Sequence, residues 1–257
     1  MTQHSARQRV HYEKILDDYE AHYYDDTSMA FRNRFVYDVM FRGLELNGKD
    51  VVDLAAGTGH NSLAVLERFP MARVVGFDIS PSACESYRKR VGADAVEMDL
   101  TKDYEGNEEF DVAMIVGGLH HCVSNLPTAL HNVARMLRPR GILLMYEPNA
   151  QFVLDAVRRL WYRYDGYFDA QTEHALDHDK CAAMAEGAGL VPFDCVYSGG
   201  PAYFLIYNSL IFRVPLALKR KMAPLLFAVE GTYNKVPWKT CFPTFIARWK
   251  KRQPEEG

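Results

Sequence analysis

Short runs of β-branched and aliphatic residues recur between residues 51 and 146, and stretches of helical periodicity lie between them. These runs fall at residues 51–54, 74–77, 95–96, 112–116 and 142–145. Acidic residues close or follow most of them, with 25 residues from Asp53 to Asp78 and 21 from Asp78 to Asp99, enough for one strand, one helix and two short loops. This alternation predicts a doubly wound, mostly parallel α/β sheet with helices on both faces.

Two apolar stripes with helical period indicate that the N-terminal fifty residues are also helical. The first runs from Val10 to Tyr23 and the second from Phe35 to Leu44, while residues 25–28 (DDTS) supply a turn and a helix cap between them. We expect these helices to cover the sheet as a lid. Further helices are predicted at residues 61–67, 126–137 and 180–189, and a sixth and a seventh strand at residues 191–197 and 244–249.

Neither an internal repeat nor a linker-like tract interrupts the sequence, so a single domain is predicted for residues 1–257. It divides into a helical cap (1–48), a core (49–150) and a C-terminal elaboration (151–257). The elaboration contains an insert, about residues 202–232, in which Leu, Phe and Tyr are interleaved with basic residues. Three interpretations of the insert stay open: a lid over a hydrophobic ligand, an interface in a homodimer, and an amphipathic surface that touches a membrane.

Composition narrows the class of protein. With 48% hydrophobic and 25% charged residues the chain is an ordinary globular protein, and its net charge of −3 disfavours nucleic acid as a partner. Five cysteines without a CxxC pair suggest neither a disulfide framework nor a zinc site, which fits a reducing, cytoplasmic location. We find no secretory signal and no apolar stretch long enough for a transmembrane helix, although peripheral membrane contact stays open.

The most informative segment is residues 53–59 (DLAAGTG), which follows a hydrophobic strand and precedes a predicted helix. Small residues there let the backbone turn sharply and present its N–H groups to a ligand. Asp78 follows Gly59 by 19 residues at the end of the second strand, where a carboxylate can accept both hydroxyls of a ribose. This combination is typical of a nucleotide-containing cofactor.

Five segments in order resemble the class I S-adenosylmethionine-dependent methyltransferases of the small-molecule type. They are residues 51–59, 75–80, 98–100, 110–121 and 136–143. The resemblance covers about residues 30–150 and implies a Rossmann-like fold, S-adenosyl-L-methionine as cofactor and residues 49–150 as the cofactor-binding core.

The resemblance also implies roles for individual residues. Gly57 and Gly59, in the motif that includes Asp53 and Ala55, let the backbone approach the methionine part of the cofactor. Asp78 holds the ribose and Asp99 accepts a hydrogen bond from the adenine amino group. The adenine lies between Ile79 and Leu100, and Val116 lines the sulfonium.

The sequence departs from the family at two positions. The family usually has glycine where Ala55 stands, and a second glycine where Arg140 precedes Gly141. The competing interpretation is a nicotinamide-dependent oxidoreductase, but its GxGxxG turn requires a glycine where Ser62 stands.

Because a sulfonium already carries a good leaving group, the protein mainly has to align the methyl acceptor and exclude water. His121 and His120 follow the fourth strand and are the candidates for a general base that deprotonates a phenol, alcohol or amine. The alternative is that they pack beside the cofactor. Similarity to the small-molecule members suggests that Tyr24 covers the cofactor and Arg32 meets its carboxylate; the alternative is that both are ordinary helix-surface residues.

A second histidine pair, His174 and His178, is predicted on one helix face, where it fits a weak metal site, a role at the methyl-acceptor site or a solvated helix start. Without a third ligand we predict no metal. The sequence also lacks a Pro-Cys nucleophile, so Cys122 is interpreted as a structural thiol.

We therefore expect an O- or N-methyltransferase for a small aromatic or hydrophobic metabolite, in keeping with the aromatic-rich residues 152–168. Two alternatives stay open. One is a methyltransferase acting on a lipid- or sugar-linked intermediate at the membrane surface, and the other is a cofactor-binding partner subunit without turnover.

Overall fold

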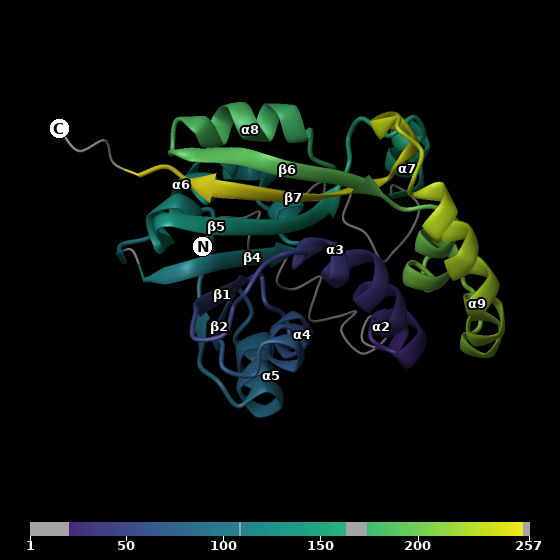
Figure 1. Cartoon of the computed structure of the whole chain (residues 1–257), viewed down its shortest axis with the longest axis horizontal. Coiled ribbons are helices and arrows are strands. Elements are labelled where there is room, and N and C mark those ends of the chain that lie inside the picture. Colours follow the sequence, from purple (N-terminus) through teal and green to yellow (C-terminus); the bar gives the residue numbers. More distant parts are fainter. Residues whose placement is uncertain (1–20, 108, 163–173, 254–257) are drawn as a thin grey trace.

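The computed structural model describes residues 21–107, 109–162 and 174–253, which form a seven-stranded sheet in the order β3-β2-β1-β4-β5-β7-β6 (Figure 1). The strands are β1 (Asp50–Leu54), β2 (Arg73–Asp78), β3 (Ala95–Glu97), β4 (Phe110–Val116), β5 (Leu137–Pro148), β6 (Leu190–Ser198) and β7 (Thr244–Lys251). β1 to β5 are parallel, and β7 runs antiparallel to β5 and β6. The doubly wound, mostly parallel sheet is confirmed.

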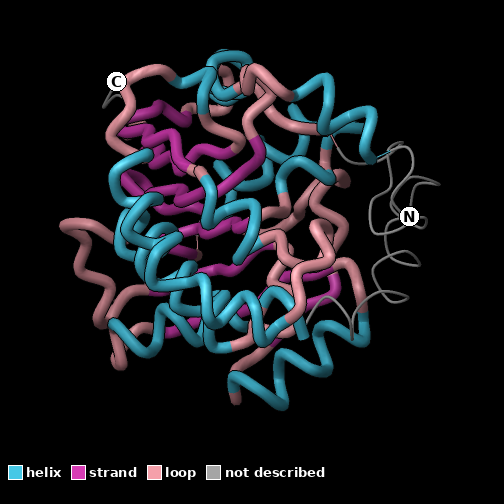
Figure 2. Tube along the Cα trace, turned by 90° about the vertical axis from the view of Figure 1, so that its right-hand side faces the viewer, coloured by secondary structure: helices cyan, strands magenta, loops and turns pink. Residues whose placement is uncertain are grey.

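Helices cover both faces of this sheet, as the end-on view in Figure 2 shows. The α-helices are α2 (Asp26–Arg32), α3 (Asp38–Met40), α4 (His60–Arg68), α5 (Pro81–Val91), α6 (Leu126–Met136), α7 (Asp155–Tyr162), α8 (His178–Glu186) and α9 (Leu216–Tyr233). There are also π-helical segments, η1 (Asn33–Tyr37) and η4 (Tyr203–Tyr207), and 3₁₀-helical segments, η2 (Leu119–His121), η3 (Val123–Asn125) and η5 (Lys239–Cys241). One core cluster joins the N-terminal helices and α4 to the sheet, and another joins α6 and α8 to its other face.

The predicted stop after α6 has a specific geometry. The helix ends at Met136, and β5 begins at once, with Leu137 beside Phe110 but Ile142 beside Val112. Residues 138–141 therefore bulge out of the strand, and Arg140 takes a positive φ of 67°.

The N-terminal cap is helical where it is described. The Asp25 side chain accepts a hydrogen bond from the backbone N–H of Ser28 and begins α2, which continues through η1 into α3. Phe35, Val36 and Met40 of the predicted second stripe are buried against the sheet. Most of the first stripe, residues 10–19, lies outside the described residues.

The insert between β6 and β7 packs against this cap through α9. Lys219 is fully buried, and its Nζ donates to the backbone oxygen of His22 (2.7 Å), to Ser28 Oγ (2.6 Å) and to the Asp25 carboxylate. Phe227 of α9 contacts the rings of Phe31 and Phe35. The insert is therefore tied to the N-terminal cap by a buried ion pair and an aromatic cluster. No helix in the described part of the chain is long and apolar enough to cross a membrane.

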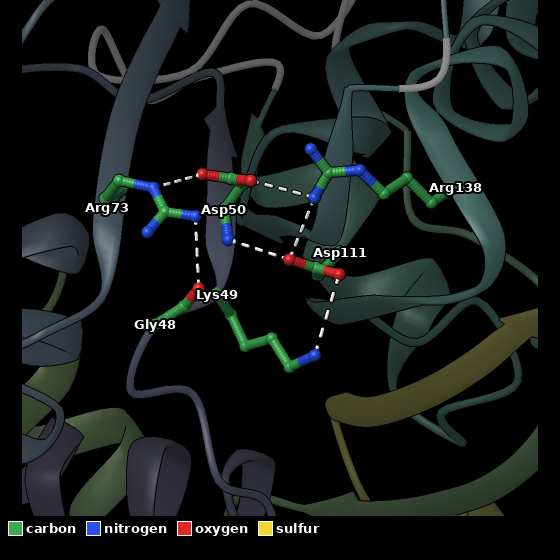
Figure 3. A network of polar contacts seen from close by, with 6 residues as sticks. All are labelled: Gly48, Lys49, Asp50, Arg73, Asp111 and Arg138. Carbon is green, nitrogen blue, oxygen red and sulfur yellow. Dashed lines mark hydrogen bonds and ion pairs between the residues drawn. The ribbon is translucent and has the colours of Figure 1, made fainter.

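A polar network ties the amino ends of the parallel strands together (Figure 3). Asp50 accepts hydrogen bonds from Arg73 Nε at 2.6 Å and from Arg138 NH1 at 2.8 Å. Arg138 also reaches Asp111 Oδ2 at 3.0 Å, and the same oxygen accepts the backbone N–H of Asp50 at 2.9 Å. These contacts join β1, β2, β4 and β5 and hold the pKa of Asp50 below its usual value, chiefly through the hydrogen bond from Arg73.

Asp50→Asn is expected to lower the free energy of unfolding at neutral pH by about 1–2 kcal/mol, because it removes charge-assisted hydrogen bonds. A carboxylate whose pKa is lowered in the folded state stabilises the protein above its unfolded-state pKa, and this stability is lost as the pH falls through the folded value. Denaturant unfolding from neutral to strongly acidic pH should therefore show the difference from wild type closing in acid.

Glu85→Gln is the matched control, because the pKa of Glu85 is lowered by Lys89 in an exposed pair on α5. Its effect should be much smaller. Equal effects of the two substitutions would contradict a special role for the strand-end network.

Candidate active site

Most of the predicted site residues lie at the carboxyl ends of β1 to β4, and the order of strands reverses between β1 and β4. The turn after β1 carries two glycines with positive φ, Gly57 at 54° and Gly59 at 93°. A Cβ on Gly59 would lie 2.4 Å from Val91 Cγ2 and 2.9 Å from a ring carbon of Tyr87. Gly59 is thus required by the close packing of α4 on α5 as well as by the turn.

Ala55 stands where the family usually has glycine, and its backbone adopts the left-handed conformation, with φ at 51°. Its methyl group faces Gly118 across the site, where a Cβ would lie 2.6 Å from the Ala55 Cβ. The departure from the family pattern at Ala55 is therefore accommodated by Gly118, which follows the neighbouring strand β4.

Asp53 is fully buried beneath the turn. Its Oδ2 accepts from Ser62 Oγ at 2.8 Å, and Ser62 Oγ in turn accepts from Tyr87 Oη at 2.7 Å. Burial raises the pKa of Asp53 to about 8, and the negative charge of Asp78 adds to this. Asp53 therefore anchors the first turn of α4, and its Oδ1 has no hydrogen-bond partner among the described residues.

Asp78 links the turns that follow β1 and β2. Its Oδ2 accepts the backbone N–H of Gly57 at 2.8 Å, and its Oδ1 accepts that of Ser80 at 2.9 Å. Each oxygen keeps a further lone pair for another donor. Burial raises the pKa of Asp78, and Ile79 beside it is half-buried.

Asp99 follows β3 and provides a test of whether the site fits the predicted cofactor. Its Oδ1 accepts from the backbone N–H of Thr101 at 3.1 Å and from Thr101 Oγ1 at 2.6 Å. Its Oδ2 is buried and accepts no hydrogen bond from the described residues. An unsatisfied buried oxygen is costly, and an amino group such as that of adenine is the kind of donor that would satisfy it. Leu100, predicted to contact the adenine, is half-buried beside it.

The turn after β4 is organised by Glu147, which lies at the end of β5 and is almost completely buried. Glu147 Oε1 accepts the backbone N–H groups of Gly118 (3.0 Å) and Leu119 (2.7 Å), and Oε2 accepts that of His120 (3.3 Å). Val116 precedes this turn and is half-buried. One carboxylate thus fixes the backbone that carries both candidate histidines.

Glu147 also holds the His120 side chain, whose Nδ1 lies 2.8 Å from Oε2. Burial raises the pKa of Glu147 to about 7 and lowers that of His120 to about 3. When the pair carries a single proton, the imidazole is neutral and holds that proton on Nδ1. His120 then donates a hydrogen bond to the Glu147 carboxylate, and its Nε2 keeps a basic lone pair. The His121 ring lies beside His120, with 4.0 Å between the ring centroids.

Tyr24 and Arg32 come together over the start of α4. The Tyr24 ring stacks on His60, the first residue of α4, with centroids 3.7 Å apart. The Arg32 guanidinium carbon lies 4.5 Å from the Tyr24 ring centroid and 4.9 Å from that of Tyr207. Arg32 is buried, so the alternative that it is an ordinary surface residue is wrong.

The predicted pairing of His174 with His178 on one helix face is wrong. His174 precedes α8 and is exposed, whereas His178 begins the helix and is buried, with Nε2 accepting from Trp249 Nε1 at 3.1 Å. Within the described ranges no group of three potential ligands could hold a metal ion.

Burial raises the pKa of the Cys122 thiol, which fits a structural role. Of the aromatic-rich stretch, residues 163–168 lie outside the described residues.

Sequence reasoning missed the role of Glu147. Glu147 could be recognised as one of the acidic residues that close or follow the predicted strands. Its partners, however, are backbone N–H groups of the turn after β4, and no spacing rule specifies these contacts. The ring of Tyr207 beside Arg32 was missed for a similar reason, because it comes from the insert about 175 residues further along the chain.

Comparison with known proteins supports the class that this geometry indicates. Residues 51–141 match the family model described as a methyltransferase domain. Ribosomal protein L11 methyltransferase of Aeromonas hydrophila is 33% identical over 138 residues, covering 48% of this chain and 47% of the relative. The ubiquinone/menaquinone biosynthesis C-methyltransferase of Dinoroseobacter shibae is 29% identical over 141 residues, covering 47% and 56%. The chain thus spans about half the length of these curated relatives.

Among solved structures, the N-methyltransferase NodS of Bradyrhizobium japonicum in complex with S-adenosyl-L-homocysteine superimposes with a TM-score of 0.55. It is 13% identical, and the match covers 92% of this chain and 98% of that one. The chain has the fold of these S-adenosylmethionine-dependent methyltransferases, and its residues 51–141 match a methyltransferase-domain model, so the predicted resemblance is confirmed. The domain and the fold imply S-adenosylmethionine as the cofactor, as predicted.

The contact between Ala55 and Gly118 can be tested by a double-mutant cycle. Ala55→Gly should raise the free energy of unfolding by about 1 kcal/mol, because glycine adopts a positive φ without strain. Gly118→Ala should lower it, because the new Cβ would meet both Ala55 Cβ and Ile115 Cγ1. Denaturant unfolding of the double variant should show that Ala55→Gly recovers part of the loss. Strictly additive effects would contradict the proposed steric coupling.

Proposed function

We propose that this chain transfers the methyl group of S-adenosylmethionine to an oxygen or nitrogen of a small aromatic or hydrophobic molecule. The observation that carries this proposal is the position of His120, a half-buried imidazole that Glu147 orients just after β4. It lies in the same row of strand ends as Asp78 and Asp99. A base beside the cofactor residues is needed when the methyl acceptor has to lose a proton.

We assign cofactor binding to the two carboxylates at the ends of β2 and β3. Asp78 holds the turn of Gly57 in place and has lone pairs left for the ribose hydroxyls. Asp99 offers Oδ2 to the adenine amino group, while Ile79 and Leu100 supply apolar contacts to the ring. The bound cofactor supplies an activated methyl group on a sulfonium.

Tyr24 and Arg32 extend the proposed cofactor site onto the N-terminal cap. Their contact over His60 places a cation beside the turn of Gly57 and Gly59. A guanidinium is suited to a carboxylate, since it donates several hydrogen bonds in a fixed plane. We therefore assign Arg32 to the carboxylate of the methionine part and Tyr24 to the exclusion of water above it.

The proposed wall for the methyl acceptor is made of tyrosines from β5 and the insert. The rings of Tyr146 and Tyr203 lie 6.1 Å and 5.7 Å from that of Tyr207, measured between centroids. Tyr146 Oη is buried and has no hydrogen-bond partner in the described part of the chain. Aromatic rings with such a polar group suit a planar acceptor that carries a hydroxyl or an amine. In this arrangement the insert belongs to the acceptor-side elaboration proposed for residues 151–257, while the helical cap proposed for residues 1–48 covers the cofactor.

His120 acts as the base through Nε2. As the pH falls through about 7, the His120–Glu147 pair takes up a second proton. If the imidazole receives it, Nε2 is protonated; if the carboxyl receives it, the carboxyl donates to Nδ1 and the imidazole proton lies on Nε2. In both cases Nε2 can no longer accept a proton. Above that pH the imidazole donates to Glu147 from Nδ1 and removes the proton of the methyl acceptor at Nε2. Glu147 is a positioning residue, since it acts through the imidazole.

The adenine assignment predicts a change of ligand preference. Asp99→Asn should weaken binding of S-adenosylhomocysteine by roughly 10- to 100-fold, because an amide N–H cannot accept from the adenine amino group. Calorimetric titration should also show that the variant prefers S-inosylhomocysteine, in which a carbonyl oxygen replaces the adenine amino group and accepts a hydrogen bond from the introduced side-chain amide. Asp103→Asn, an exposed change in the same loop, should leave both affinities unchanged. Unaltered preference in Asp99→Asn would overturn the assignment.

The base assignment predicts a loss of turnover at constant cofactor affinity. A screen of phenols and amines by mass spectrometry, scored by the gain of one methyl group, would supply the acceptor. His120→Asn keeps a donor toward Glu147 but loses the basic nitrogen, so kcat should fall roughly 10²- to 10⁴-fold while S-adenosylhomocysteine binds as before.

The pH profile separates a base from a packing residue. Wild-type turnover should decline below about pH 7, and Glu147→Gln should abolish or displace this decline. His131→Asn, an exposed histidine on α6, is the control and should follow wild type. Full activity of His120→Asn across the pH range would refute the role of His120 without affecting the cofactor assignment.

A further inference from the structure

Two helices at one end of the molecule turn apolar side chains outward and polar ones inward. In and just before α7, the exposed apolar residues are Val153, Leu154, Val157 and Leu160. The buried side of the same helix holds Asp155 and Arg158, which pair with each other. Arg158 also donates to the backbone oxygens of Asn149 (2.7 Å) and Pro243 (3.1 Å). These contacts fix the rotation of α7 and keep its apolar side facing outward.

Helix α9 likewise exposes apolar side chains and buries two charged ones, Lys219 and Glu230, beside the apolar Ala223 and Leu226. Leu218, Leu225 and Val229 are exposed at a spacing of seven and four residues, which places them on one side of the helix. On the buried side, Lys219 binds Asp25, and Glu230 accepts the backbone N–H groups of Gly200 (2.8 Å) and Ala202 (2.9 Å). Rolling Leu225 inward would break these buried polar contacts, which is costly.

The two apolar sides belong to one region of the surface. Phe152, just before α7, contacts the ring of Phe204 with 6.3 Å between centroids, and Phe204 contacts the exposed Phe212 at 5.8 Å. The backbone N–H of Val153 also donates to Thr240 at 2.8 Å, two residues after the exposed Trp238. Figure 1 shows α7 and α9 beyond the same end of the sheet, toward which the carboxyl ends of the parallel strands point.

The charge around this region is positive in a protein whose net charge is −3. Residues 202–243 contain six basic residues and one acidic residue, Glu230, which is buried. Lys219 and Lys239 pair with Asp25 and Asp179. The remaining basic residues Arg213, Arg220, Lys221 and Lys235 are exposed.

From this inversion we propose that α7, α9 and the segment that carries Trp238 form a docking surface for a membrane rich in anionic lipid. Exposed apolar side chains flanked by Lys and Arg match the chemistry of a bilayer interface. Its hydrocarbon side accepts the apolar groups, and its anionic headgroups attract the basic ones. Trp238 suits the same environment, since an indole combines a large apolar ring with one polar N–H. The strand ends of the candidate site then face the membrane, within reach of an acceptor held in it.

Vesicle binding of the full chain tests this surface without any need for turnover. The protein should co-sediment with phosphatidylcholine vesicles that contain about one third phosphatidylglycerol, and much less with phosphatidylcholine alone. Raising the salt from about 0.1 M to about 0.5 M should release most of the bound protein, because attraction to the surface charge is screened.

Matched variants locate the contact. Leu225→Glu should weaken binding at least tenfold, whereas Met71→Glu, at an equally exposed apolar residue in the loop before β2, should not. Lys221→Glu should also weaken it about tenfold, since it changes the local charge by two, whereas Lys250→Glu on β7 should not. Circular dichroism and thermal unfolding verify that each variant is folded.

Three outcomes would overturn the proposal. The first is no binding to anionic vesicles at low salt. The second is binding that Leu225→Glu and Met71→Glu affect equally. The third is a protein that does not bind vesicles but whose oligomeric state, measured by light scattering, changes when Leu225 is replaced. The surface would then be a contact between two copies of the chain. Loss of vesicle binding with intact methyl transfer would leave the proposed function untouched.

Discussion

The arrangement of the candidate active site depends on one buried carboxylate, Glu147. It accepts three backbone N–H groups from the turn after β4, and its Oε2 lies 2.8 Å from Nδ1 of His120 in the same turn. Without these contacts the N–H groups of Gly118 and Leu119 would be buried and unsatisfied, at a cost of about 1–3 kcal/mol each. The turn that presents the histidines therefore depends on a residue of the neighbouring strand.

The same constraint connects structure to chemistry. A carboxylate that accepts hydrogen bonds from the backbone N–H groups of a buried turn must itself be removed from water. This burial raises the pKa of Glu147 to about 7. Burial also keeps His120 neutral, so its position and its protonation state have a common cause. The protonation of the proposed base and its carboxylate partner is thus set by the same packing that closes the end of the sheet.

The sheet and the cofactor-side residues could be predicted because they follow from local rules. Parallel strands bury both faces, so their apolar runs stand out, and the carboxyl ends of such strands meet at one edge. The sequence alone therefore predicts that Asp53, Asp78 and Asp99 lie in one row. Ala55 could be identified as a departure, but its compensation by Gly118 could not, since it depends on the distance between two strands.

Features that depend on long-range contacts were not predictable. The pair of His174 and His178 satisfied helical spacing, yet the helix begins only at His178 and the two rings have different surroundings. Glu147 was visible as an acidic residue after a strand, but its role depends on how the turn of another strand folds onto it. Similarly, Arg32 is buried because Tyr207 of the insert covers it.

The insert shows why a hydrophobic pattern alone left its role open. From the sequence, a lid, a homodimer interface and a membrane surface were alternatives, but α9 has two different sides. Its inner side is fixed by Lys219 and Glu230, polar residues that a pattern argument would place in solvent. Because these residues are inside, Leu218, Leu225 and Val229 are outside. Closing over the site and facing a membrane are therefore compatible roles of one helix, and the buried polar contacts that support the first also produce the surface proposed for the second.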